Sequence, residues 1–138
     1  MAVISRVLRE FVTKRANGLC EYCQTSQFIV IEMEIDHIIP ESAGGLTVEG
    51  NLCFACVSCN NHKSATQTAF DPESAAEVPL FNPRTQKWND HFRWNDDSTR
   101  LIGLTPNGRA AIERLKMNRE LVINARERWV KAGWHPPD

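Results

Sequence analysis

Two Cys-x-x-Cys pairs, Cys20–Cys23 and Cys56–Cys59, constrain this chain of 138 residues more than any other feature of its sequence. Each pair can deliver two thiolates to one metal ion, and two pairs supply the four soft ligands of a tetrahedral zinc site. A structural zinc contributes on the order of 10 kcal/mol or more of folding free energy, which is comparable with the net stability of a small domain. The sequence therefore predicts a structural Zn²⁺ site made of these four cysteines.

The fifth cysteine, Cys53, makes the total odd, which fits a disulfide framework poorly. Cys53-x-x-Cys56 is also an allowed metal-binding pair, so the spacing alone leaves the role of Cys53 open. Burial as a small hydrophobic residue is the commonest role of a free cysteine, and we expect it here.

The composition is that of an ordinary globular protein, with 42% hydrophobic and 24% charged residues. These values argue against a disordered, collagen-like or membrane-spanning chain. No apolar run approaches the roughly 20 residues that cross a bilayer, and the N-terminus lacks the pattern of a secretory signal. We therefore expect a cytoplasmic protein without a membrane partner.

Charge is unevenly distributed, although the net charge is only −1. From Arg84 to Lys131 eleven Lys or Arg stand against six Asp or Glu, whereas from Met1 to Lys63 five stand against seven. A basic segment of this kind can follow a polyanion along its length. A pair of solvated helix faces is the alternative.

The N-terminal half predicts a helix, a strand and a second helix. Apolar residues recur at helical spacing over Val3–Arg15, and β-branched residues are frequent over Phe28–Ile39. A loop rich in proline and glycine follows as far as Asn51, and residues 57–68 can form a short helix. One face of the strand is polar because acidic residues alternate along it: Glu32, Glu34 and Asp36.

The C-terminal half begins with a proline-rich stretch, Asp71–Arg84, which predicts a connector without packed structure. A hairpin is expected from His91–Trp94 and Thr99–Leu104, joined by a polar turn. Two helices follow, from Thr105 to Met117 and from Asn118 to Ala132. Their inward residues are expected to be Ala111, Ile112, Leu115, Leu121, Val122, Ala125 and Trp129.

Between the two cysteine pairs lies Asp36-His37-Ile38-Ile39-Pro40, followed by Gly44-Gly45, by Asn51 and, after Cys59, by Asn60-Asn61-His62-Lys63. The order and spacing of these residues resemble the HNH endonuclease family, in the subgroup whose ββα-metal motif is built on a four-cysteine zinc site. The resemblance covers residues from about Gly18 to Lys63.

The resemblance implies a ββα-metal core held by the zinc site. Combined with the elements predicted above, this gives an α+β fold in which residues 1–68 hold the core and an N-terminal helix. We expect residues 69–138 to form an extension of connector, β-hairpin and two helices packed on the same domain. By matching position, His37 would be the general base and Asp36 a ligand of the catalytic ion. Asn51 would brace the loop that positions the base, and Asn60 would be the second ligand.

General chemistry supports these roles. Histidine titrates near neutral pH, so His37 can take a proton and release it in each turnover. Mg²⁺ accepts few protein oxygens and keeps several waters, so Asp36 and Asn60 can suffice as ligands. Many family members carry histidine where this chain has Asn60, and an amide matches Mg²⁺ or Mn²⁺ better than Zn²⁺. Lys63 can add a positive charge near a phosphate, and His62 is a rival ligand that we expect to face away.

Basic and aromatic residues alternate after Pro83, and Arg84, Lys87 and Arg93 are candidate phosphate contacts. The alternative is that Trp88, Phe92 and Trp94 form the core of the hairpin, and we favour it.

The function predicted from these observations is a metal-dependent HNH endonuclease that hydrolyses phosphodiester bonds in DNA, with RNA not excluded, as a monomer or homodimer. The alternative is a zinc-stabilised nucleic-acid-binding module without catalysis. A pure binding module has no need of a histidine base beside two oxygen ligands, which favours the enzyme.

Overall fold

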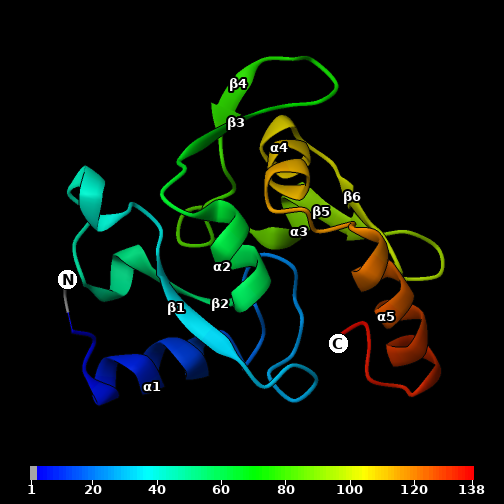
Figure 1. The fold of residues 1–138 in the computed structure, drawn as a ribbon, viewed down its shortest axis with the longest axis horizontal. Coiled ribbons are helices and arrows are strands. Elements are labelled where there is room, and N and C mark those ends of the chain that lie inside the picture. Colours follow the sequence, from blue (N-terminus) through cyan, green and yellow to red (C-terminus); the bar gives the residue numbers. More distant parts are fainter. Residues whose placement is uncertain (1–2) are drawn as a thin grey trace. The chain divides into compact units, whose positions relative to one another are not determined.

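The computed structural model describes residues 3–138, which form two compact units. The first unit comprises the described residues through Gln67 together with Asn82–Thr85, and the second comprises Thr68–Phe81 and Gln86–Asp138. Helices and two-stranded antiparallel sheets alternate along the chain, as Figure 1 shows, so the predicted α+β class is confirmed. None of the helices in the described part of the chain has the length and apolar character needed to cross a membrane.

The first unit begins with helix α1 (Arg6–Arg15). Ser5 caps it, because its side chain accepts a hydrogen bond from the Leu8 amide at 3.2 Å. The helix ends at Ala16, and the positive φ angles of Asn17 and Gly18 turn the chain away. The predicted helix is confirmed, although it begins after the cap and not at Val3.

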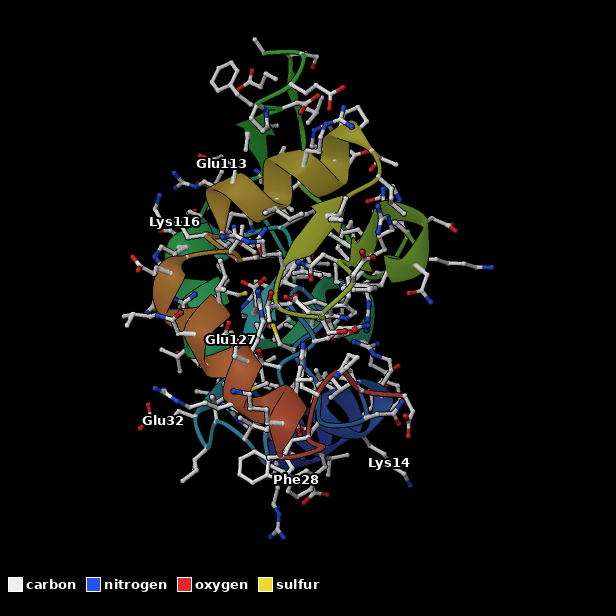
Figure 2. The ribbon with its side chains drawn as sticks, turned by 90° about the vertical axis from the view of Figure 1, so that its right-hand side faces the viewer. Lys14, Phe28, Glu32, Glu113, Lys116 and Glu127 are labelled. Carbon is white, nitrogen blue, oxygen red and sulfur yellow. The ribbon has the colours of Figure 1, made fainter. Side chains whose placement is uncertain are left out.

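Strands β1 (Met33–His37) and β2 (Leu52–Cys56) pair antiparallel, and helix α2 (Val57–Lys63) follows β2 directly. The register places Asp36 opposite Cys53. The strand predicted over residues 28–39 is shorter than expected because Phe28 and Ile31 lie in a turn and are 89% and 92% exposed. Figure 2 shows the Phe28 side chain at the periphery. Helix α2 likewise ends before the expected residue 68, at Ser64.

The β1–β2 sheet lies between the two helices of this unit, with α1 on one face and α2 on the other (Figure 1). The α1 face carries the apolar core, in which Val12, Leu52 and Phe54 are buried and Met33 and Ile35 are partly buried. Successive side chains of a strand point to opposite faces, so Glu34 and Asp36 lie on the α2 face. The expected division of β1 into a polar and an apolar face is confirmed.

In the second unit, strands β3 (Thr68–Phe70) and β4 (Glu77–Pro79) pair as a hairpin. The prediction of an unpacked connector over residues 71–84 is therefore wrong. Asp71, Leu80 and Phe81 in this stretch are buried. Each strand has only three residues, which is too short for a visible period-two pattern.

Helix α3 (Trp88–His91) leads into strand β5 (Phe92–Trp94), which pairs with β6 (Leu101–Gly103) as predicted. Phe92 is 1% exposed, and its ring lies 5.2 Å from that of Trp88. Trp88 also lies 6.1 Å from Trp94. The favoured alternative, an aromatic core for the hairpin, is confirmed.

Helices α4 (Pro106–Arg114) and α5 (Glu120–Lys131) complete the second unit. Ala111 on α4 and Leu115, which caps the end of this helix, are buried as expected. On α5 the expected inward position of Leu121 is wrong, because it is 79% exposed while Val122 and Arg126 are buried. The Arg126 guanidinium donates to the carbonyls of Thr99 and Met117 at 3.0 and 2.7 Å, which turns this side of the helix inward.

Candidate metal centre and active site

The sulfur atoms of Cys20, Cys23, Cys56 and Cys59 all lie within 4.8 Å of one another, and all four residues are buried. The two pairs come from the turn after α1 and from the junction of β2 with α2. The Cys23 and Cys56 sulfurs are 3.7 Å apart. Zn–S bonds of about 2.3 Å in a tetrahedron give sulfur separations of about 3.8 Å, so this cluster fits a zinc ion.

Local backbone geometry prepares the cluster for a cation. The amides of Cys23 and Cys59 donate to the sulfurs of Cys20 and Cys56 at 3.5 and 3.4 Å. Hydrogen bonds from the other three cysteines hold the pKa of the Cys23 thiol well below its usual range, whereas burial raises the pKa of Cys20. A metal ion displaces the remaining thiol protons when it binds. All five cysteines are free thiols, so none is committed to a disulfide.

The Asp36 carboxylate lies on the α2 face of β1 and is 5% exposed. Tyr22 donates its hydroxyl to Oδ2 at 2.7 Å, and the Lys63 ammonium lies 3.2 Å from the same oxygen. Cys53 is fully buried as expected and donates to Tyr22 and Asp36 at 3.3 and 3.6 Å. Burial and the Asp36 charge raise the pKa of Cys53, which keeps it a thiol.

Lys63, which we expected to add a positive charge near a phosphate, is buried, with 2% exposure. Besides Asp36, its ammonium donates to the backbone carbonyls of His37 and Ile38 at 3.2 and 3.3 Å. Four oxygen atoms thus surround one buried cation at the end of β1. Residue type and spacing carry no signal for this arrangement, because a lysine four residues after Cys59 would ordinarily be solvated.

Asn60 lies one helical turn before Lys63 and faces Glu34. Its amide nitrogen donates to the Glu34 carboxylate at 3.2 Å. Two polar pairs, Glu34–Asn60 and Asp36–Lys63, therefore connect β1 to α2. Glu34 lies on the polar face predicted for the strand, but its contact with Asn60 does not follow from the sequence pattern.

His37 occupies the end of β1, on the other side from Asp36. Its Nε2 atom lies 2.9 Å from the Thr47 hydroxyl and 3.2 Å from the Glu41 carboxylate. Its side chain is 15% exposed. Both partners come from the β1–β2 connection, and no sequence pattern marks either of them as a partner of His37.

Asn51 braces this connection. Its Oδ1 accepts from the Ile39 amide at 2.9 Å, while its Nδ2 donates to the carbonyls of Ile39 and Leu46 at 3.0 and 2.9 Å. Gly45 must be glycine, because a Cβ there would lie 1.7 Å from the Ile39 carbonyl oxygen. The loop is thereby held closed across its base.

Each of the three predicted catalytic side chains has its own partner: Lys63 for Asp36, Thr47 for His37 and Glu34 for Asn60. The alternation of the strand separates the first two. His62 is half-buried and its Nδ1 lies 2.8 Å from the Ser58 carbonyl of its own helix.

The expected phosphate contacts outside the core lie in different surroundings. Arg84 is not free on the surface, because its guanidinium forms an ion pair with Glu21 and is 13% exposed. Glu21 in turn accepts from the Phe54 amide at 2.8 Å, so this pair fixes Asn82–Thr85 on the first unit. Lys87 and Arg93 are exposed in the second unit, where a phosphate contact stays a prediction.

Residues 20–66 match the family model described as HNH endonuclease. The matched segment begins at the first zinc-site cysteine and contains β1, β2 and α2. Over this segment the chain is similar to HNH endonucleases, and the predicted resemblance is confirmed. The second unit's helices and hairpins beyond residue 68 lie outside the match. A search of curated proteins found no match to this chain.

Proposed function

We propose that this chain is a metal-dependent endonuclease that hydrolyses phosphodiester bonds in DNA, with His37 as the general base. The observation that carries the proposal is the position of His37. It ends β1 inside the matched segment, its ring is held at Nε2, and its side chain keeps 15% exposure. A base must be both oriented and reachable by water, and this histidine meets both conditions.

The α2 face of β1 fits a hard divalent cation by its donor chemistry. Asp36 and Asn60 offer a carboxylate and an amide oxygen, and Glu34 lies beside Asn60 as a further donor. These are the ligand types that Mg²⁺ and Mn²⁺ prefer. When bound, such an ion neutralises a phosphate and stabilises the departing oxygen.

The four-cysteine cluster has a structural role in the proposed function. Four sulfur ligands complete a tetrahedron and leave no position for water or substrate, which is typical of a structural zinc. We therefore propose that Zn²⁺ in this cluster joins the turn at Cys20 to the start of α2, and so fixes α2 against β1.

A zinc-stabilised nucleic-acid-binding module without catalysis is the second candidate. It is favoured by the ion pair of Asp36 with Lys63, because this pair already neutralises the carboxylate that an ion would use. Both candidates bind nucleic acid, so binding alone does not distinguish them.

Cleavage of supercoiled plasmid by zinc-loaded protein distinguishes the two candidates. We expect nicked or linear DNA with Mg²⁺ or Mn²⁺, and no cleavage with a chelator until the ion is restored. His37→Ala should lower the cleavage rate by about 10²-fold or more, because a general base contributes that much. His62→Ala is the matched control, since this ring is bonded to its own helix.

Folding and zinc content of His37→Ala are measured alongside, because the substitution lies outside the cysteine cluster and should change neither. Wild-type cleavage by His37→Ala would contradict the assignment of the base. Binding of DNA without cleavage under any divalent ion would support the binding module.

A further inference from the structure

We propose that Glu41 and Thr47 are positioning residues that fix His37 as the tautomer with hydrogen on Nε2, leaving Nδ1 as the proton acceptor. This inference rests on the proposed function of His37 as a base. It adds two residues and one defined ring nitrogen to that function.

The two partners act on the same nitrogen atom. Nε2 of His37 lies 3.2 Å from the Glu41 Oε1 atom and 2.9 Å from the Thr47 Oγ1 atom. An ionised carboxylate only accepts hydrogen bonds, whereas a hydroxyl both donates and accepts. A lone pair on Nε2 would therefore face the negative oxygen of Glu41 with no proton between them. The carboxylate selects the tautomer in which Nε2 carries the hydrogen.

The other ring nitrogen of His37, Nδ1, is available to accept a proton. Within residues 3–138 we find no hydrogen-bond partner for Nδ1 of His37. With hydrogen on Nε2, Nδ1 keeps its lone pair. A water molecule can then lose a proton to Nδ1 as its oxygen bonds to phosphorus and the bond to the leaving oxygen breaks. The charge that forms on the ring is opposite to that of Glu41, which stabilises it.

The loop fixes both partners in place. Glu41 begins the short helix η1 (Glu41–Ala43). The amides of Ala43 and, beyond this helix, of Gly45 donate to the Pro40 carbonyl at 2.9 and 3.0 Å. Thr47 follows Leu46, whose carbonyl is held by Asn51 at 2.9 Å. The backbone hydrogen bonds of the closed β1–β2 loop therefore hold Glu41 and Thr47 near His37.

The tautomer is measured directly by two-dimensional ¹⁵N NMR of the histidine rings, with His37 assigned by its absence from His37→Ala. At about pH 8.5, where histidine rings are ordinarily neutral, we expect the Nε2–H pattern in the zinc-loaded wild type. Glu41→Ala should shift it toward a mixture of tautomers. An Nδ1–H pattern in the wild type would overturn the inference.

Steady-state kinetics of DNA cleavage test whether Glu41 and Thr47 contribute to catalysis through His37. Glu41→Ala should lower kcat by about tenfold or more with KM for DNA changed less than about twofold, because only part of the base contribution is lost. Glu41→Gln keeps an acceptor oxygen and should restore part of kcat, and Thr47→Val should cost less than Glu41→Ala. The matched control is Glu49→Gln, an exposed glutamate of the same loop, which should behave as wild type.

Failure of the positioning role and failure of the proposed function give different results. If His37→Ala is inactive while Glu41→Ala cuts at the wild-type rate, the positioning role is overturned and the proposed function stands. If His37→Ala itself cuts normally, the proposed function is overturned, and the positioning role with it. A raised KM with unchanged kcat in Glu41→Ala would also overturn the inference, since it indicates DNA binding.

Discussion

At the scale of single residues, the pair formed by Lys63 and Asp36 places two charged groups where little water reaches them. Their side chains are 2% and 6% exposed. Removing such charges from water costs several kcal/mol for each ion, so the pair is tolerable only when its remaining hydrogen bonds are satisfied. The Tyr22 hydroxyl donates a hydrogen bond to the Asp36 carboxylate. The Lys63 ammonium donates to the carbonyls of His37 and Ile38.

Lys63→Met should therefore destabilise the first unit by about 3–5 kcal/mol, because it leaves the Asp36 carboxylate buried without its counter-charge. Urea unfolding of the zinc-loaded protein, followed by circular dichroism, measures the change. The double variant Asp36→Asn with Lys63→Met should recover most of the loss, since no unpaired charge remains. Lys14→Met, on the exposed Lys14 labelled in Figure 2, is the control and should change stability by less than about 0.5 kcal/mol. Equal losses in the single and double variants would contradict the explanation.

The candidate site shows which roles of single residues can be predicted from the sequence. The cysteine tetrad and the buried Cys53 follow from residue type and spacing, and the structure agrees in both cases. The bracing role of Asn51 is implied only by the family resemblance, and its side-chain hydrogen bonds to Ile39 and Leu46 support that role. The partners of His37 do not follow, because Glu41 and Thr47 meet it only after the loop closes on itself. The burial of Lys63 does not follow either, because it depends on four oxygen atoms of Asp36, His37 and Ile38.

At the scale of secondary-structure elements, the β3–β4 hairpin is joined to α4 by one bidentate ion pair. Arg109 donates Nε and Nη2 to the two Asp71 oxygens, each at 2.9 Å. Asp71 also accepts from the Ser74 hydroxyl at 2.7 Å, which closes the hairpin turn. These hydrogen bonds, those of Arg109 above all, hold the pKa of Asp71 well below its ordinary value.

A lowered pKa in the folded state means that Asp71 stabilises the second unit at pH values above its unfolded pKa, near 3.9 for an ordinary aspartate. That contribution is lost as the pH falls below this value toward the folded pKa. Asp71→Asn should therefore lower the urea midpoint at neutral pH and lessen its fall between about pH 4 and pH 2. Tryptophan fluorescence is the measurement, and Asp96→Asn, in the exposed turn of the β5–β6 hairpin, is the control. An unchanged acid dependence in Asp71→Asn would assign the acid sensitivity to another group.

Elements differ in how far their own sequence specifies them. The β5–β6 hairpin and α4 carry local signals, namely a polar turn and the Thr105-Pro106 start, and both form as predicted. The β3–β4 hairpin has no such signal, because its anchor Asp71 depends on Arg109, 38 positions away in the sequence. Leu121 was misplaced for the same reason, since Arg126 takes the inward position through bonds to distant carbonyls.

At the scale of the whole molecule, each compact unit has its own buried residues and its own polar anchor. The first has the cysteine tetrad, and the second has the Asp71–Arg109 pair and Arg126. The aromatic residues that report on folding are also divided between the two units. All four tryptophans lie in the second unit, whereas the one tyrosine, Tyr22, is buried in the first. Each unit can therefore be followed separately.

Removal of zinc should unfold the first unit, because a structural zinc site supplies about as much free energy as a small domain retains in total. Freshly prepared protein should contain about one zinc per chain by elemental analysis, as one tetrahedral site requires. Cys59→Ala should lose this zinc, and the matched variant Cys53→Ala should keep it, since Cys53 lies outside the tetrad.

The tryptophan signal then decides how far the two units depend on each other. With its own aromatic core of Trp88, Phe92 and Trp94, the second unit should keep its folded emission when a chelator removes the zinc. DNA cleavage should be lost, together with the share of the far-ultraviolet circular dichroism that comes from α1 and α2 of the first unit. Returning zinc should restore both signals. Simultaneous loss of tryptophan emission on chelation would contradict independent folding and would indicate that residues 69–138 unfold together with the zinc core as one domain.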